Sequence, residues 1–78
     1  MAAIRVLLFG PLAEQHGSSE ALVEITTDST ALDVVHQLGM ASWLEAGLRC
    51  AVDGRFCELE SRIDSADELA LLPPVSGG

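Results

Sequence analysis

The sequence predicts an α+β domain in which a mixed sheet of about five strands surrounds one central helix. Three observations indicate this fold class. Several short segments alternate apolar and polar residues with the period of a strand, and one apolar stripe repeats at helical spacing. Between two of the strand-like segments, Asp53-Gly54 is a strong signal for a two-residue hairpin turn. With 78 residues, 49 % of them hydrophobic, the chain has enough apolar surface for one small domain and no room for a second.

The first third of the chain predicts a strand, a short helix and a second strand. A strand over residues 3–9 ends at Gly10-Pro11, and a helix over residues 11–16 stops at Gly17. The second strand covers residues 20–26. Alternation along the two strands predicts which side chains face the core. They are Ile4, Val6 and Leu8 in the first strand and Ala21, Val23 and Ile25 in the second.

The middle of the chain predicts the central helix. Asp28-Ser29-Thr30 supplies candidate N-caps, and Asp33 places a negative charge in the first turn. A helix over residues 30–38 then presents an apolar stripe made of Leu32, Val35 and Leu38, and Gly39 closes it. The stretch from 40 to 46 is ambiguous, and we read it as a short helical turn that tucks Trp43 or Leu44 over the core.

The last third predicts three strands, over residues 48–52, 55–58 and 68–72. The first two form a hairpin around Asp53-Gly54, and an acid-rich connection over 61–68 leads to the third. Leu59 and Ile63 are possible anchors for that connection. The strand residues expected to face the core are Leu48, Cys50, Val52, Leu69 and Leu71.

This order of elements has a compact solution when the first and last strands lie side by side and parallel. That arrangement is the β-grasp, or ubiquitin-like, architecture, and it leaves one sheet face uncovered. Apolar side chains on an open face suggest a binding patch, although loops that cover the face, or a register shifted by one residue, are alternatives. On this register the open face carries Leu7, Phe9, Ala51, Phe56, Ala70 and Leu72.

The formal net charge of −8 comes from twelve acids against four arginines, with no lysine. This excess of acidic side chains disfavours nucleic-acid binding. It is consistent either with a surface that only keeps the protein in solution or with a surface that binds a basic partner. Without lysine, copies of the chain cannot be joined to one another through lysine side chains. The sequence shows neither a membrane span nor a signal peptide, so we expect a cytoplasmic protein that does not bind membranes.

The hairpin turn brings the only two cysteines opposite each other. With Asp53-Gly54 in the turn, Cys50 faces Cys57 in a hydrogen-bonded pair, the wider class of antiparallel pair. In a cytoplasmic protein we expect two reduced, half-buried thiols. Two cysteines supply only two of the four ligands of a tetrahedral metal site, so we expect no bound metal.

The chain closes with residues 72–78, a strand end followed by two prolines, one β-branched residue, one small residue and two glycines. We therefore divide the whole chain into a domain over residues 1–72 and a flexible tail over residues 73–78. Pro73-Pro74 is expected to act as a short polyproline-like spacer, and Gly77-Gly78 has no side chain to prevent entry into a narrow channel. An ordinary frayed terminus is the alternative, but this combination of residues favours function.

Three segments resemble the MoaD/ThiS sulfur-carrier family, most closely its molybdopterin synthase branch. They are the opening over 4–14, the hairpin over 50–54 and the ending over 67–78. The Pro-Pro-Val-Ser-Gly-Gly ending is the most specific of the three. Two positions depart from the usual family pattern: Asp53 stands where Asn is common, and Ser65-Ala66 precedes Asp67.

The resemblance implies a defined chemistry for the tail. A ubiquitin-activating-like adenylyltransferase uses ATP to adenylate Gly78, and a sulfur donor converts it to a thiocarboxylate. The large subunit of molybdopterin synthase then binds the tail while its sulfur is transferred to a cyclic pyranopterin precursor, in a two-plus-two heterotetramer. No cofactor would be bound stably. The expected channel residues are Pro73, Pro74, Val75, Ser76 and Gly77, and the expected partner surface is Leu7, Phe9, Phe56 and Leu72.

Two other functions remain open from the sequence. One is a sulfur carrier of the same fold for thiamine, tRNA thiolation or cysteine synthesis, and the other is a ubiquitin-like interaction module whose tail is never activated. His16, His36 and Cys57 have no neighbouring catalytic motif, so we assign them no catalytic role.

Overall fold

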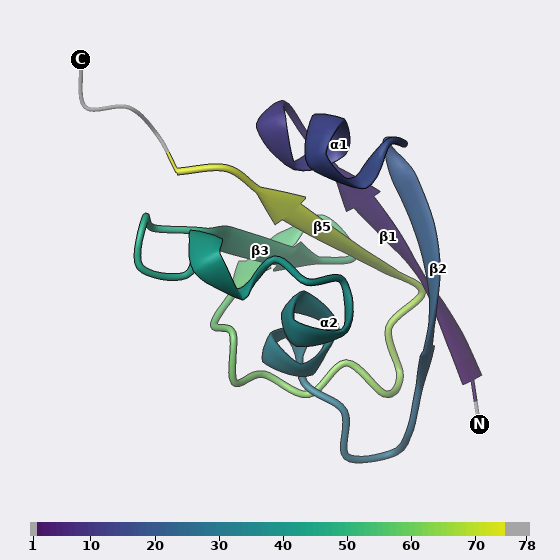
Figure 1. The fold of residues 1–78 in the computed structure, drawn as a ribbon. Helices are drawn as coiled ribbons and strands as arrows, with labels where there is room; N and C mark the ends of the chain where they lie inside the picture. Colours follow the sequence, from purple (N-terminus) through teal and green to yellow (C-terminus); the bar gives the residue numbers. More distant parts are fainter. Residues whose placement is uncertain (1, 75–78) are drawn as a thin grey trace.

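The computed structural model describes residues 2–74, which form one five-stranded sheet with helices against one of its faces (Figure 1). The strand order is β2-β1-β5-β3-β4. Each α-helix and strand agrees with the sequence prediction to within one residue at its ends, and the 3₁₀ turn lies inside the stretch 40–46 that was expected to form a short helical turn. In chain order the elements are β1 (Ala2–Leu8), α1 (Pro11–His16), β2 (Glu20–Ile25), α2 (Ala31–Gln37), the 3₁₀ turn η1 (Ala41–Trp43), β3 (Arg49–Val52), β4 (Arg55–Cys57) and β5 (Glu68–Leu72).

The last strand lies at the centre of the sheet. β5 pairs with β1 in parallel and with β3 antiparallel, while the β1–β2 and β3–β4 pairs are antiparallel. The predicted mixed sheet, with its first and last strands adjacent and parallel, is therefore confirmed. Because β5 leads directly into Pro73, the tail leaves the domain from the middle of the sheet (Figure 1).

The core lies between the sheet and α2. The alternation predicted for β1, β2 and β5 is confirmed, with Ala21 in β2 only partly buried. In β3, Cys50 is buried as predicted, but Ala51 on the other face is also buried and Val52 is only partly buried. Leu59, a predicted anchor of the connection before β5, is partly buried as well. No helix in residues 2–74 is long and apolar enough to cross a membrane. The fully buried side chains with the largest volumes are Ile4, Leu12, Met40, Ile63, Leu69, Leu71, Val6, Val34, Val35 and Cys50.

The apolar stripe of α2 differs from the prediction. Val35 is buried as predicted, but Ala31 and Val34 are buried in place of Leu32 and Leu38, which are only half-buried. The Leu32 backbone N–H donates to the Leu59 carbonyl, in the connection after β4, at 2.8 Å. Small side chains thus occupy the surface that packs closest to the sheet.

The start of α2 is fixed by a capping box. Asp33 N–H donates to Thr30 Oγ1 at 3.3 Å, and Thr30 N–H donates to Asp33 Oδ2 at 2.9 Å. These two bonds satisfy backbone donors that a helix N-terminus otherwise leaves without partners. Of the three candidate caps, Thr30 is the one used; Ser29 is buried and its Oγ accepts from the Thr26 N–H at 2.8 Å.

The segment between α2 and β3 forms the predicted short turn, but its most buried residue was not predicted. Trp43 and Leu44 are partly buried against the core, and Met40 is fully buried. Trp43 Nε1 donates to Gln15 Oε1 at 2.9 Å, so η1 is joined to α1 across the end of the sheet.

The acid-rich connection before β5 is held at both ends. Ile63 is buried, as predicted for an anchor. At the other end the carboxylate of Asp53 accepts hydrogen bonds from the backbone N–H groups of Asp67 and Glu68. Asp53 has a φ of 47°, and with Gly54 at 86° it forms the predicted hairpin turn between β3 and β4.

Candidate functional site at the base of the tail

One row of side chains crosses the whole open face of the sheet. The strand register aligns, from β2 to β4, Glu20, Leu7, Ala70, Ala51 and Phe56. The predicted assignment of Leu7, Ala51, Phe56, Ala70 and Leu72 to this face is therefore correct, and no one-residue shift occurs in the strands; Phe9 follows the end of β1 and is not part of the register. The exposed fraction of the side chains varies along the row. Phe56, on the edge strand, is 66 % exposed, whereas Ala51, on β3, is only 8 % exposed.

The next row lies beside the tail. Leu72 is paired with Arg49, and Phe9, the residue after β1, is 44 % exposed. The Arg49 guanidinium carbon lies 4.8 Å from the centroid of the Phe56 ring, a cation–π contact between diagonal positions on β3 and β4. Sequence reasoning missed Arg49, although its place two residues before Ala51 puts it on the same face as Phe56.

A shallow hollow of about 360 Å³ is lined by residues of this face together with the two prolines that follow β5. Its lining is apolar except for the Arg49 side chain. A hydrophobic partner surface can therefore enter here, and Arg49 can at the same time attract a carboxylate. We call this feature the tail-base hollow; its lining residues are Arg49, Phe56, Leu72, Pro73 and Pro74.

The two prolines lie against the domain surface. Both are half-buried. An ideal Cβ placed on Gly10 would lie 3.6 Å from Pro73 Cγ, and one placed on Gly47 would lie 3.4 Å from Pro74 Cβ. The predicted spacer therefore begins on the protein, between these two glycines. The other predicted channel residues and the predicted reactive residue, Val75, Ser76, Gly77 and Gly78, lie outside the described residues.

The two cysteines are opposite each other, as the hairpin predicted. Their Sγ atoms are 3.3 Å apart; Cys50 is buried and Cys57 is half-buried. Burial raises the pKa of the Cys50 thiol to about 12, with further contributions from its hydrogen bond to Cys57 and from the charges of Cys57 and Glu60. Among residues 2–74 there is no group of three or more histidine, cysteine or acidic side chains placed to hold a metal ion.

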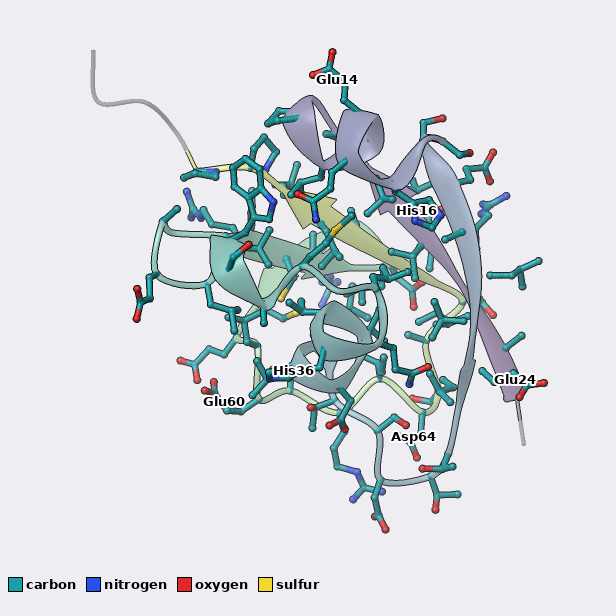
Figure 2. The ribbon with its side chains drawn as sticks, in the orientation of Figure 1. Glu14, His16, Glu24, His36, Glu60 and Asp64 are labelled. Carbon is teal, nitrogen blue, oxygen red and sulfur yellow. The ribbon has the colours of Figure 1, made fainter. Side chains whose placement is uncertain are left out.

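The two histidines lie on different helices. Figure 2 shows His16 on α1 and His36 on α2, well separated, while the carboxylates of Glu14 and Glu24 point away from the body of the protein. The two histidines therefore do not form a common site.

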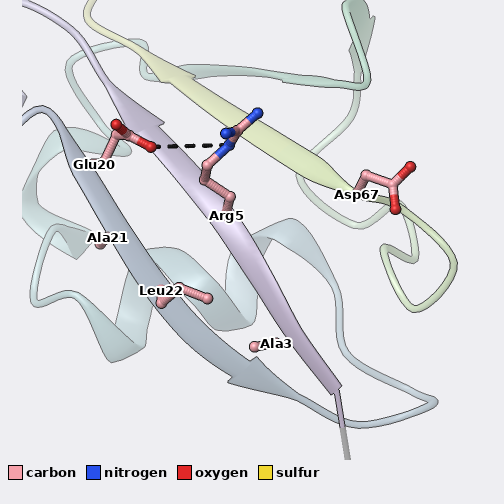
Figure 3. Close-up of a pocket in the computed structure, with 6 residues that line it drawn as sticks. All are labelled: Ala3, Arg5, Glu20, Ala21, Leu22 and Asp67. Atoms are coloured by element: carbon pink, nitrogen blue, oxygen red, sulfur yellow. Dashed lines mark ion pairs between the residues drawn. The ribbon is translucent and has the colours of Figure 1, made fainter.

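A larger hollow than the tail-base hollow lies on the outer side of β1 and β2 (Figure 3). It has a volume of about 590 Å³, and Leu22 in its wall is 77 % exposed. Its cation, Arg5, forms ion pairs with Glu68 at 2.7 Å and with Glu20 at 3.9 Å, and these carboxylates raise the arginine's pKa. Arg5 is thus already paired on the sheet surface.

The sheet topology and the central position of β5 define a ubiquitin-like β-grasp protein. The sequence model of the ThiS family matches residues 6–78, and the chain belongs to that family. It is a sulfur carrier of the ThiS/MoaD type.

Its relatives agree with this assignment. A molybdopterin synthase sulfur carrier subunit from Dictyostelium discoideum is 32 % identical over 82 aligned positions, which cover 95 % of this chain and 94 % of that protein. The crystal structure of small archaeal modifier protein 1 from Haloferax volcanii is 30 % identical, with a TM-score of 0.78, over 96 % of this chain and 100 % of that one. A putative molybdopterin converting factor subunit 1 from Pyrococcus furiosus shares the fold with a TM-score of 0.76 at 16 % identity, over 96 % of this chain and 100 % of that one.

Proposed function

We propose that the chain is the sulfur-carrier subunit of a molybdopterin synthase and that the carboxyl group of Gly78 carries the sulfur. The observation that carries this proposal is the likeness to the molybdopterin synthase sulfur carrier subunit over nearly the full length of both proteins. The family match extends through residue 78 and so includes the whole tail.

The chemistry begins with activation. A carboxylate is a poor electrophile because its negative charge repels nucleophiles and it has no adequate leaving group. Attack of the Gly78 carboxylate on the α-phosphorus of ATP, in a ubiquitin-activating-like adenylyltransferase, releases pyrophosphate and forms an acyl adenylate. Sulfide then displaces AMP and leaves a thiocarboxylate. If a persulfide is the sulfur donor, a thiol must afterwards reduce the acyl disulfide to the same product.

The thiocarboxylate is ionised at neutral pH, and its sulfur is a soft nucleophile. In the large subunit of molybdopterin synthase it would attack a carbon of cyclic pyranopterin monophosphate, and hydrolysis of the resulting thioester would return the Gly78 carboxylate. Basic side chains of the partner would neutralise the charge on the tail. The described residues contribute docking: the tail-base hollow and the exposed Phe9 and Phe56 lie where the tail leaves the sheet.

A second candidate is supported by the modifier protein from Haloferax volcanii, which is 30 % identical over nearly the whole chain. In that case the activated Gly78 would acylate an amine of another protein. Copies of this chain would not be linked through lysine, because the sequence contains none. A carrier for thiamine, tRNA thiolation or cysteine synthesis would use the same thiocarboxylate with a different acceptor.

Intact mass separates these functions. The full chain is incubated with ATP, an adenylyltransferase of demonstrated activity and sulfide, and we expect one oxygen atom of Gly78 to be replaced by sulfur. The large subunit and cyclic pyranopterin monophosphate should then return the chain to its starting mass and yield molybdopterin. A matched control with one alanine appended after Gly78 should fold normally and transfer no sulfur.

An unchanged mass after activation would contradict every carrier function. A thiocarboxylate that is stable with the pyranopterin and large subunit would exclude the molybdopterin pathway alone. Attachment to lysine-containing proteins in place of sulfur transfer would favour the modifier.

A further inference from the structure

We propose that Cys50 and Cys57 are a reversible disulfide site, which a small-molecule disulfide oxidises to a covalent bond between β3 and β4. The sulfur-carrier function does not use either thiol, and the inference holds whether or not that function is correct. It rests on the register of the hairpin, the distance between the two sulfur atoms and the difference in their exposure.

The hairpin geometry matches what a disulfide requires. Cys50 and Cys57 are direct partners in the antiparallel β3–β4 pair, so both side chains point to the same face of the sheet. Because this is a hydrogen-bonded pair, its Cα atoms are expected roughly 5.5 Å apart, inside the range of about 4.4–6.8 Å that disulfides span. The Sγ atoms are 3.3 Å apart, so a bond of about 2.05 Å needs only a small further approach.

The edge strand can supply that approach. β4 consists of three residues and has β3 as its one neighbour among the described strands, whereas β3 lies between β4 and β5. A short edge strand with one neighbour moves at less cost than a central strand, because fewer backbone hydrogen bonds are disturbed.

The two thiols differ in access, which sets the order of reaction. Cys57 is half-buried on the edge strand and reaches solvent, while Cys50 is 1 % exposed. Cys57 is therefore the thiol that meets the oxidant, and Cys50 is the resolving thiol. Formation of a mixed disulfide at Cys57 removes two of the causes that raise the pKa of Cys50, namely its hydrogen bond to Cys57 and the charge of that thiol.

The exchange is balanced in two steps. The Cys57 thiolate attacks one sulfur of a disulfide RSSR, which forms a mixed disulfide and releases RS⁻. The Cys50 sulfur then attacks the Cys57 sulfur, expels a second RS⁻ and gives up its proton to it. Overall, two protein thiols are oxidised and one RSSR is reduced to two thiols. Because Phe56 precedes Cys57, the new bond also fixes the edge strand that carries this exposed ring.

The test uses the full 78-residue chain and hydroxyethyl disulfide, an uncharged probe that avoids repulsion from the net charge of −8. We expect the wild-type chain to stay monomeric, to lose the mass of two hydrogen atoms and to have no thiol left for alkylation. Dithiothreitol should restore the starting mass. In the folded chain the ratio of internal disulfide to mixed disulfide should be at least about tenfold higher than in concentrated urea, since the fold holds the two thiols together.

The single-cysteine variants test the order of reaction. Cys50→Ala keeps the accessible thiol and should accumulate the mixed disulfide only. Cys57→Ser keeps the buried thiol and should be modified at least about tenfold more slowly, because attack requires local opening. Each variant's circular dichroism spectrum shows whether it has folded.

Stability gives an independent readout that needs no variant. If disulfide formation is tenfold more favourable in the folded chain than in the unfolded chain, the free energy of unfolding of the oxidised chain should exceed that of the reduced chain by about 1.4 kcal/mol. Three outcomes would overturn the proposal: a stable mixed disulfide at Cys57 in the wild type, oxidation only to disulfide-linked dimers, or an internal disulfide that forms no more readily in the folded chain than in urea.

Discussion

Oδ1 of Asp53 accepts a hydrogen bond of 3.0 Å from the backbone N–H of Glu68, which lies 15 residues further along the chain. The same oxygen accepts from the N–H of Asp67 at 3.1 Å, and the Asp53 N–H donates to the Glu68 carbonyl at 3.0 Å. One turn residue therefore closes the β3–β4 hairpin and also fixes where β5 begins.

This relationship predicts that the side-chain oxygen of Asp53 matters more than its charge. Asp53→Gly keeps the positive φ but removes the acceptor, and we expect it to lower the free energy of unfolding by about 1–2 kcal/mol because two backbone N–H groups lose their partner. Asp53→Asn retains Oδ1 and tolerates the same φ, so its cost should stay below about 0.5 kcal/mol. Urea denaturation measures both; equal losses would show that the negative charge is what matters.

The position of Phe56 beside the tail predicts a role in docking that the equally apolar Leu22 does not share. Phe56→Asp should weaken binding to the activating or large partner subunit by at least about tenfold, because it removes an exposed aromatic anchor and adds charge. Leu22→Asp is the matched control, since Leu22 is 77 % exposed on the opposite edge of the sheet. Affinities from titration calorimetry decide the matter: equal effects, or none, would place the docking surface elsewhere.

Gly47 is expected to set the path of the tail base. Its φ of +104° strains any residue with a Cβ, and that Cβ would meet Pro74. Gly17, with a φ of +91° and nothing within 4 Å of its ideal Cβ, is the control for strain alone. Gly47→Ala and Gly17→Ala should each cost about 1–2 kcal/mol of stability.

Only Gly47→Ala should also shift the NMR amide signals of Arg49 and Leu72, the pair next to the prolines. Undisturbed signals at those two residues would mean that the tail base does not depend on Gly47.

The buried thiol of Cys50 predicts a loss of stability in alkaline solution. Its pKa is raised from 9.0 to about 12, so the unfolded chain gives up this proton at lower pH than the folded chain does. The stabilisation from this group is complete below about pH 9 and is lost as the pH rises toward about 12. The chain has no lysine or tyrosine to titrate in the same range.

Unfolding free energies measured between pH 8 and pH 12, under reducing conditions, test this prediction, and thiolate absorbance follows the ionisation itself. Cys50→Ala should show a distinctly shallower decline. An identical decline in this variant would assign the effect to other groups.

Local patterns predicted the sheet well. The alternation of Ile4, Val6 and Leu8 identified the buried face of β1, and Asp53-Gly54 fixed the register of β3 against β4, because a two-residue turn leaves only one pairing. Those two facts were enough to place Phe56 on the open face. The same turn placed the cysteines opposite each other.

Features that depend on contacts between distant segments were not predictable. Leu32 has the spacing of a core residue, but Ala31 and Val34 are buried beside Val35 instead, since the docking angle of α2 is set by the whole core. Met40 lies outside any regular element, so periodicity gave no indication of its burial. The double use of Asp53 was not predictable because its partners, Asp67 and Glu68, lie 14 and 15 residues further along the chain.

The central position of β5 has a mechanical consequence for any partner that pulls on the tail. Tension applied through Pro73 acts along β5, which is bonded to β1 on one side and to β3 on the other. Such a load shears both ladders at once, so their hydrogen bonds must yield together instead of opening one after another as they would when an edge strand is peeled away. The tail is therefore attached at the position in this sheet that best resists extraction.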